Sequence, residues 1–149
     1  MTDCSRTAMP IMYRIDHQRK LVIARGYGAF TGDDIFSYQR DVWSGKDVVG
    51  YDELVDMTFV TRTARPTPEQ LRNLATLASQ MDLASAPSRF AIVGAGDDAH
   101  ALGLAFQKQR QLQKRSSKDV GVFRTLREAW EFLNVVDPPE LPPPPAPQA

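Results

Sequence analysis

The sequence predicts an α/β fold, in which a mixed, mainly parallel five-stranded sheet packs against four helices. Nearly continuous apolar runs at residues 54–60 and 89–94 are typical of strands covered on both faces. Stretches with helical periodicity separate these runs, as in the strand–helix–strand units of parallel sheets. A chain of 149 residues has the size of one domain.

The N-terminal part of the chain predicts a hairpin followed by a helix. Residues 12–17 and 21–27 are rich in apolar and β-branched side chains and are joined by the polar QRK, which predicts two antiparallel strands. Thr31 then precedes GDDIF, with Asp34 at the capping-box position. Apolar residues recur at helical spacing as far as Gly45, which predicts the first helix.

The central strand and the second helix follow. The run LVDMTFV, residues 54–60, predicts the strand, and TPEQ predicts a helix start with Thr67 as N-cap and Pro68 at the first position. The apolar stripe of this helix leaves its polar side chains, Ser79 among them, facing outward.

The C-terminal half repeats the alternation of strands and helices. RFAIVG predicts a buried strand, and the helix after it has acids at its start and bases at its end, in agreement with the helix dipole. KDVGVF predicts the last strand, and Thr125 caps the final helix, LREAWEFL. The order β-β-α-β-α-β-α-β-α gives right-handed crossovers and a sheet whose first strand is antiparallel.

Three segments are expected: a flexible N-terminus at residues 1–10, the domain at residues 11–134 and a Pro-rich disordered tail at residues 135–149. The tail, DPPELPPPPAPQA, can form neither helix nor sheet because prolines remove backbone donors. A polyproline run of this kind either docks in an aromatic groove of a partner or remains a mobile, solubilising tail.

Charge and composition exclude several classes of function. The chain has 18 Lys and Arg against 18 Asp and Glu, so no long-range field attracts it to nucleic acid or an anionic membrane. The basic stretch at residues 107–118 fits either phosphate contacts or a solvated basic face at a helix C-terminus. No nucleic-acid partner is therefore expected.

Counts of ligand-type residues and of apolar residues set two further expectations. The only nitrogen or sulfur ligands are Cys4, His17 and His100, so we expect no metal site, and we also expect no cofactor. Neither a signal segment nor an apolar run long enough to span a membrane is present. The expected location is the cytoplasm.

Several stretches, GYGAFT, ELVDMTFV, RFAIVG and VGVFRTLREAWEFL, resemble the STAS superfamily and especially its SpoIIAA-like (STAS/SEC14-like) branch. The resemblance covers residues 11–134 and includes Asp56 in the central strand and Phe123 before the last helix. It implies a non-catalytic regulatory or interaction domain that binds a protein partner or a small ligand, and it is compatible with a homodimer. The alternative that it implies is a carrier of a small hydrophobic or lipid-like ligand.

Relatives of the anti-sigma-antagonist type are switched by phosphorylation of a serine at the start of the helix after the central strand. No such serine follows Val60, where TRTARPT stands instead. Thr67 is already engaged as an N-cap. The sequence therefore lacks the phosphorylatable motif of these switches.

The predicted binding site lies at the carboxyl ends of the strands, where open α/β sheets form their crevices. Its candidate residues are Asp56, Thr61, Arg62, Thr63, Arg65, Thr67, Gly94 and Gly96. The guanidinium groups of Arg62 and Arg65 either hold a phosphate, a carboxylate or an acidic partner, or are simply solvated. Asp56 lies in an apolar strand, so it needs hydrogen-bond partners such as N–H groups of a neighbouring loop; a catalytic acid is the other interpretation.

A nucleotide-binding enzyme is a second alternative, because Gly94-x-Gly96-x-x-Ala99 matches the dinucleotide fingerprint and lies between a strand and a helix. Against it, Asp97 and Asp98 bring negative charge to the place of the pyrophosphate. The other interpretation is a strand-to-helix turn that needs flexible glycines.

A last candidate is an apolar pocket between the helices and the sheet. Its bulky side chains, which can also simply fill the core, are Phe36, Tyr38, Trp43, Met57, Phe59 and Met81. A ligand carrier predicts a cavity of roughly 300 Å³ or more.

Overall fold

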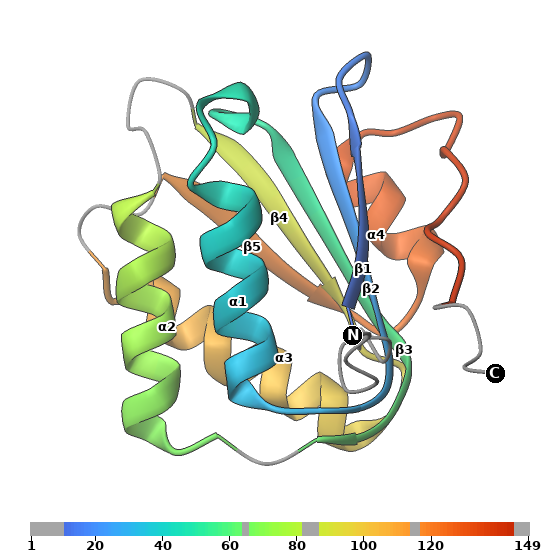
Figure 1. Cartoon of the computed structure of the whole chain (residues 1–149). Coiled ribbons are helices and arrows are strands. Elements are labelled where there is room, and N and C mark those ends of the chain that lie inside the picture. The colour runs from blue at the N-terminus through green and yellow to red at the C-terminus, as the bar shows by residue number, and fades with distance from the viewer. Residues whose placement is uncertain (1–10, 64–65, 82–86, 114–116, 145–149) are drawn as a thin grey trace, which may run out of the picture.

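The computed structural model describes residues 11–63, 66–81, 87–113 and 117–144 (Figure 1). Within them the chain forms five strands, four α-helices and one short 3-10 helix. In chain order these are β1 (Ile11–Asp16), β2 (Leu21–Phe30), α1 (Gly32–Trp43), the 3-10 helix η2 (Lys46–Val48), β3 (Asp52–Thr63), α2 (Pro68–Gln80), β4 (Ser88–Val93), α3 (Asp97–Gln111), β5 (Lys118–Phe123) and α4 (Leu126–Leu133). The predicted α/β class and element order are confirmed.

The sheet follows the sequence, with strands in the order β1-β2-β3-β4-β5. β1 is antiparallel to β2, and the remaining pairs are parallel, as predicted. Each crossover moves to the next strand in the same direction, and right-handed crossovers of that kind place their helices on one face. α1, α2 and α3 accordingly pack on one face of the sheet, and α4 packs on the other.

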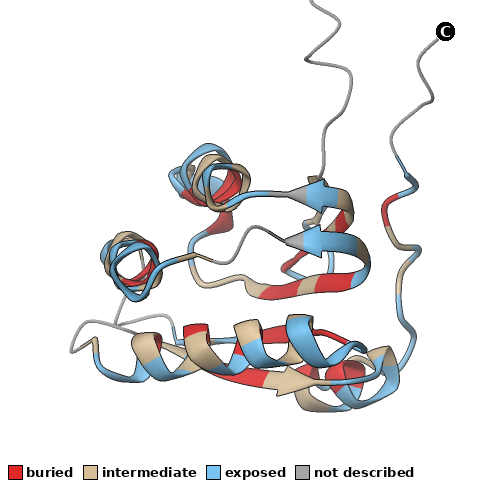
Figure 2. Cartoon of the chain, turned by 90° about the horizontal axis from the view of Figure 1, so that it is seen from below, coloured by how far each residue is buried: buried red, intermediate tan, exposed pale blue. Residues whose placement is uncertain are grey.

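The core lies on both faces of the sheet, which explains the continuous apolar runs. In β2, Val22 and Ala24 pack with α1, whereas Leu21 and Ile23 pack with α4 on the opposite face. All four side chains are at most 1% exposed. Figure 2 shows the buried positions in the strands and on the inner sides of the helices.

Thr67 is the N-cap of α2, as predicted, and Gln70 completes a capping box with it. The Gln70 N–H donates to Thr67 Oγ1 at 3.1 Å, and the Thr67 N–H donates to Gln70 Oε1 at 2.8 Å. The prediction that Ser79 faces outward is wrong, because this residue is only 2% exposed. α2 is flanked by both α1 and α3, so it buries a wider stripe than a helix that contacts the sheet alone.

The predicted end of the central strand is also corrected. The sequence predicts a loop after Val60, but β3 continues to Thr63 because its pairing with β2 continues through Ala29 and Phe30. The proline-containing loop therefore begins three residues later than predicted.

A buried polar network joins α1, β3 and β5. Glu53, which is 2% exposed, accepts a hydrogen bond from the Tyr38 hydroxyl at 2.7 Å and one from Lys118 Nζ at 3.1 Å. Lys118 Nζ lies 3.3 Å from the centroid of the Trp43 ring, a cation–π contact. Burial, and then the charge of Glu53, raise the pKa of Tyr38 well above its ordinary value of 10.0, so the hydroxyl stays a donor.

Lys118→Met tests the importance of this network. The substitution leaves the Glu53 carboxylate buried without its cation, so we expect the free energy of unfolding to fall by about 3–5 kcal/mol. The double variant Glu53→Gln/Lys118→Met removes both charges of this pair and should recover a large part of that loss. Urea unfolding followed by circular dichroism measures both; equal losses in the single and double variants would show that the two groups are not coupled.

Candidate functional site

Strands β2 and β3 extend beyond their neighbours at the carboxyl end of the sheet. β4 pairs with β3 only as far as Asp56, whereas β2 remains paired with β3 as far as Thr63. β1 pairs with β2 only up to Gly26. Residues 27–30 and 59–63 therefore form a two-stranded parallel ribbon with no further strand partner among the described residues. We call it the projecting ribbon, and Figure 2 shows the exposed ends of its strands.

An ion pair lies at the base of this ribbon. Arg25 and Asp56 are register partners on β2 and β3, and Arg25 Nε donates to Asp56 Oδ2 at 2.9 Å. The N–H of Thr58 donates to Oδ1 at 3.0 Å, and the Thr58 hydroxyl donates to the same oxygen. Asp56 is 0% exposed, so these donors satisfy a charge that would otherwise be costly to bury. The carboxylate is thus engaged in holding two strands together.

A bulge follows the ion pair and turns an aromatic side chain toward Arg25. Arg25 pairs with Asp56 and Tyr27 pairs with Phe59, so β3 has one residue more than β2 over this interval. The Tyr27 and Phe59 rings stack with their centroids 5.8 Å apart and their planes at 13°. The Arg25 guanidinium carbon lies 4.5 Å from the centroid of the Phe59 ring. Phe59 is nevertheless 49% exposed, which makes it an aromatic side chain held rigidly at the surface.

The predicted site residues at the end of the central strand are divided between three places. Thr61 and Arg62 are exposed on the projecting ribbon. Thr67 is the N-cap of α2. Arg65 and the side chain of Thr63 lie outside the described residues. Phe59, Thr61 and Arg62 thus all lie on the β3 strand of the ribbon. The exposure of Phe59 there could not be read from its sequence position.

The turn between β4 and α3 contains Gly94 and Gly96. A Cβ built on Gly94 would lie 2.8 Å from backbone atoms of both Ala99 and His100, so glycine here permits the first turn of α3 to approach the strand end. Gly96 is the N-cap of α3, and a Cβ there would meet no heavy atom within 4 Å. The first glycine of this turn therefore has a packing role.

The same turn is fixed by Arg124, which follows β5. Its Nη1 donates to the Ala95 carbonyl oxygen at 3.2 Å and to the Asp97 carboxylate at 2.9 Å. A pyrophosphate at the start of α3 would have to lie beside the carboxylate of Asp97. This arrangement gives no support to the nucleotide-binding alternative.

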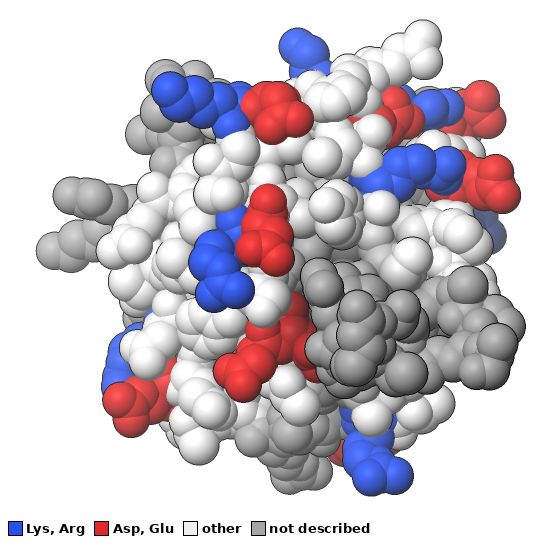
Figure 3. Space-filling view, viewed as in Figure 1, with Lys and Arg blue, Asp and Glu red and all other residues white. Residues whose placement is uncertain are grey.

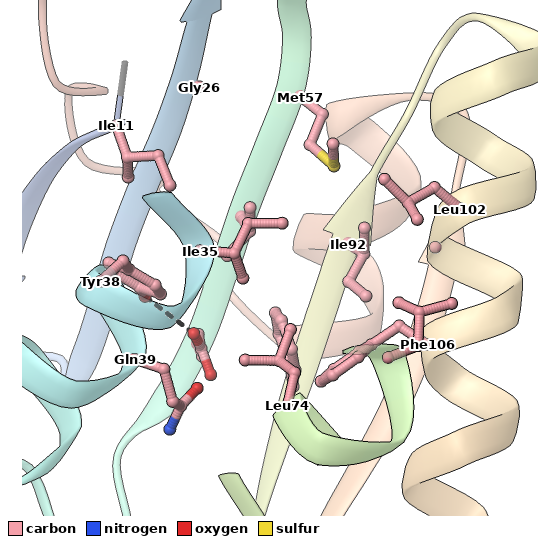
Figure 4. Close-up of a pocket in the computed structure, with 15 residues that line it drawn as sticks. Ile11, Gly26, Ile35, Tyr38, Gln39, Met57, Leu74, Ile92, Leu102 and Phe106 are labelled. Atoms are coloured by element: carbon pink, nitrogen blue, oxygen red, sulfur yellow. Dashed lines mark hydrogen bonds between the residues drawn. The ribbon is translucent and has the colours of Figure 1, made fainter. Parts of the chain in front are cut away.

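The residues considered for an apolar pocket do not share one cavity. Tyr38 and Met57 line an apolar cavity of about 70 Å³ between the sheet and the three helices on its face (Figure 4). The others lie elsewhere: Phe36 beside the cluster of α2 and α3, Trp43 and Met81 in the cluster around α1, and Phe59 on the ribbon. An engineered cavity that binds benzene has a volume of about 150 Å³. The cavity of this chain is therefore too small, as it stands, for a lipid-like ligand.

The part of the chain that the structure describes contains neither a cluster of metal-ligand side chains nor a membrane-spanning helix. Among those residues, no group of three or more His, Cys, Asp or Glu side chains could hold a metal ion. No helix there has the length and apolar character needed to cross a membrane. Figure 3 shows acidic and basic side chains intermixed over the visible face, in keeping with the formal net charge of +0.

The fold is similar to that of a solved structure. This is the crystal structure of an uncharacterized protein from the DUF3478 family, with a SpoIIAA-like fold, from Shewanella loihica PV-4. The TM-score is 0.52 with 16% sequence identity, over 83% of this chain and 93% of the other. No protein-family model matches the sequence, and no curated protein does. The chain thus has a SpoIIAA-like fold, and the resemblance to the STAS/SpoIIAA-like domains is confirmed at the level of the fold.

Gly94→Ala tests the packing role of the β4–α3 turn. The added methyl group would overlap backbone atoms, so we expect the free energy of unfolding to fall by about 1–3 kcal/mol. Gly32→Ala is the matched control, because its Cβ would meet nothing within 4 Å, and its effect should stay within about 0.5 kcal/mol. A Gly94→Ala variant as stable in urea as the control would argue against the close approach of α3 to β4.

Proposed function

We propose that this chain is a non-catalytic interaction domain that binds a protein partner through the projecting ribbon. The observation that carries the proposal is that, among the described residues, β2 and β3 extend beyond β1 and β4. Parallel strands are normally enclosed within a sheet that is covered on both faces. Unpaired strand edges are templates for a further strand or segment, and adding a strand to such an edge is a common mode of peptide recognition.

The side chains of the ribbon suit a protein interface. Phe59 supplies a rigid, half-exposed aromatic surface, and Arg62 supplies an exposed guanidinium group on the same strand. Aromatic residues and arginine are the types most often found at the energetic centres of interfaces. A guanidinium group also favours carboxylates on the partner.

The titratable groups around the site support binding over catalysis. An active site needs a nucleophile, a base or an oxyanion donor set that converges on a cleft. The charged groups described above are instead engaged in pairs that hold the fold: Asp56 with Arg25, Glu53 with Lys118 and Asp97 with Arg124. The apolar cavity is lined mostly by apolar side chains, and Tyr38 and Glu53, which also line it, are hydrogen-bonded to each other.

The carrier hypothesis has less support than the interaction hypothesis. It requires room for a ligand, and the apolar cavity holds about 70 Å³. A homodimer, by contrast, is one form of the proposed interaction.

Site-specific photo-crosslinking in cells of the source organism tests the proposal. A photo-reactive amino acid at Thr61, on the ribbon, is expected to give one discrete adduct. The same group at Leu104, which is 45% exposed on α3, should give none. Phe59→Ser should reduce the Thr61 adduct about tenfold, because loss of an anchor residue costs 1 kcal/mol or more.

Mass spectrometry of the adduct distinguishes a second copy of this chain from another protein. Equal labelling at Thr61 and Leu104, or a Thr61 adduct that is insensitive to Phe59→Ser, would contradict a partner bound at the ribbon.

A further inference from the structure

The C-terminal segment packs on the same face of the sheet as α4. α4 packs mainly on β4 and β5 and less on β3. On the same face of β2, Leu21 and Ile23 belong to the apolar cluster around α4, and Leu141 of the C-terminal segment packs against that cluster as well. Residues 134–144 have no helix or strand, and they turn back from α4 to the β1–β2 side of the sheet (Figure 1). The sequence predicted a mobile tail; the described part of this tail makes defined contacts, whereas residues 145–149 lie outside the described residues.

The tail contacts the region of β2 at both ends of the strand. Near the β1–β2 turn, Arg19 Nη2 donates to the Asp137 carbonyl oxygen at 2.8 Å. At the far end, the Tyr27 hydroxyl donates to the Pro142 carbonyl oxygen at 2.7 Å. Leu141 packs against the apolar cluster between α4 and the sheet, and Pro142 is buried. The segment thus covers a surface that runs from the pocket beside Arg19 to Tyr27, and we call this surface the groove along β2. On it the segment makes an apolar contact through Leu141 and accepts two hydrogen bonds through its carbonyl oxygens.

Contacts of this kind are the ones through which proteins recognise proline-rich segments. Prolines have no N–H, so a protein recognises them through their carbonyl oxygens and their apolar rings. The extended conformation of such segments is largely preformed, which lowers the entropy lost on binding. The groove offers the Tyr27 hydroxyl as a donor to a carbonyl oxygen, and the ring that carries it is held in place by its stack on Phe59.

Charged residues border the same surface. A groove at the β1–β2 hairpin is lined by Arg14 and Arg19 from the hairpin and by Pro139 and Glu140 from the tail. Arg19 also pairs with Asp16 at 2.9 Å. Arg14 of the hairpin and Glu140 of the tail thus line one pocket and bring opposite charges to it.

We propose that the groove along β2 is a binding site for proline-rich extended segments of partner proteins, and that residues 137–144 occupy it as an intramolecular ligand. This goes beyond the proposed function, because the groove runs from the base of the ribbon toward the β1–β2 turn, away from the ribbon tip. A partner segment must displace the tail, whose covalent link gives it a high effective concentration. Release of the tail therefore controls access to the groove.

A labelled peptide with the sequence of residues 137–144, DPPELPPP, tests the proposal on the full chain by fluorescence polarisation. Leu141→Asp removes the apolar contact of the tail and should increase the affinity for the peptide at least tenfold over the wild type. Tyr27→Phe in the same background keeps the ring and loses the donor, so affinity should fall about 3- to 10-fold, the range for one neutral hydrogen bond. A peptide with alanine in place of every proline should not bind.

A second measurement does not depend on the Leu141 variant. A nitroxide label on Pro144→Cys, in a Cys4→Ser background, reports the mobility of the tail. Excess unlabelled peptide should sharpen its spectrum by displacing the tail, and Tyr27→Phe should sharpen it without peptide. The proposal is overturned if folded Leu141→Asp binds no better than the wild type, or if neither peptide nor Tyr27→Phe changes the label. Peptide binding without a crosslinked adduct at Thr61 would support the binding site in the groove and count against a partner site on the projecting ribbon.

Discussion

The ion pair between Arg25 and Asp56 lies on the last row in which all five strands are paired, from Met12 across to Phe123. Beyond this row β1 pairs with β2 once more, Ile11 with Gly26, and then only β2 and β3 continue among the described residues. A fully buried carboxylate is tolerated there because a guanidinium group and Thr58 satisfy it. The pair therefore fixes the register at the point where the bulge begins, and the bulge places Phe59 against Tyr27. Both proposed binding surfaces depend on these two rings.

Most of the fold could be predicted because its signals are local. The capping box at Thr67, the apolar run at residues 54–60 and the acids at the start of α3 each act within a few residues. Ser79 was misplaced because its burial depends on which helices flank α2. The length of β3 was underestimated for a similar reason, since pairing with β2 rather than strand propensity extends it through Thr63.

The sequence directs attention to the carboxyl end of the central strand, where the proposed ribbon lies, but it does not identify all of the residues there. The carboxyl end of the central strand was expected to carry the binding site, and Thr61 and Arg62 are exposed there. Arg25 and Tyr27 could not be identified, because their roles follow from the register between two strands far apart in sequence. The Glu53–Lys118 pair spans two strands that are not neighbours, and no sequence pattern encodes such a contact. The proline-rich composition of the tail excludes secondary structure but says nothing about where the tail packs.

The projecting ribbon and the groove along β2 thus both depend on the ion pair between Arg25 and Asp56, which lies where the five-stranded part of the sheet ends. Amide hydrogen exchange in Asp56→Asn measures this most directly, because the variant keeps the shape of the side chain and removes its charge. Exchange should accelerate at residues 57–62 and at Leu141, while the amides of β4 keep the protection of the wild type. Unchanged exchange in the ribbon, or equal acceleration throughout the sheet, would contradict this role of the ion pair.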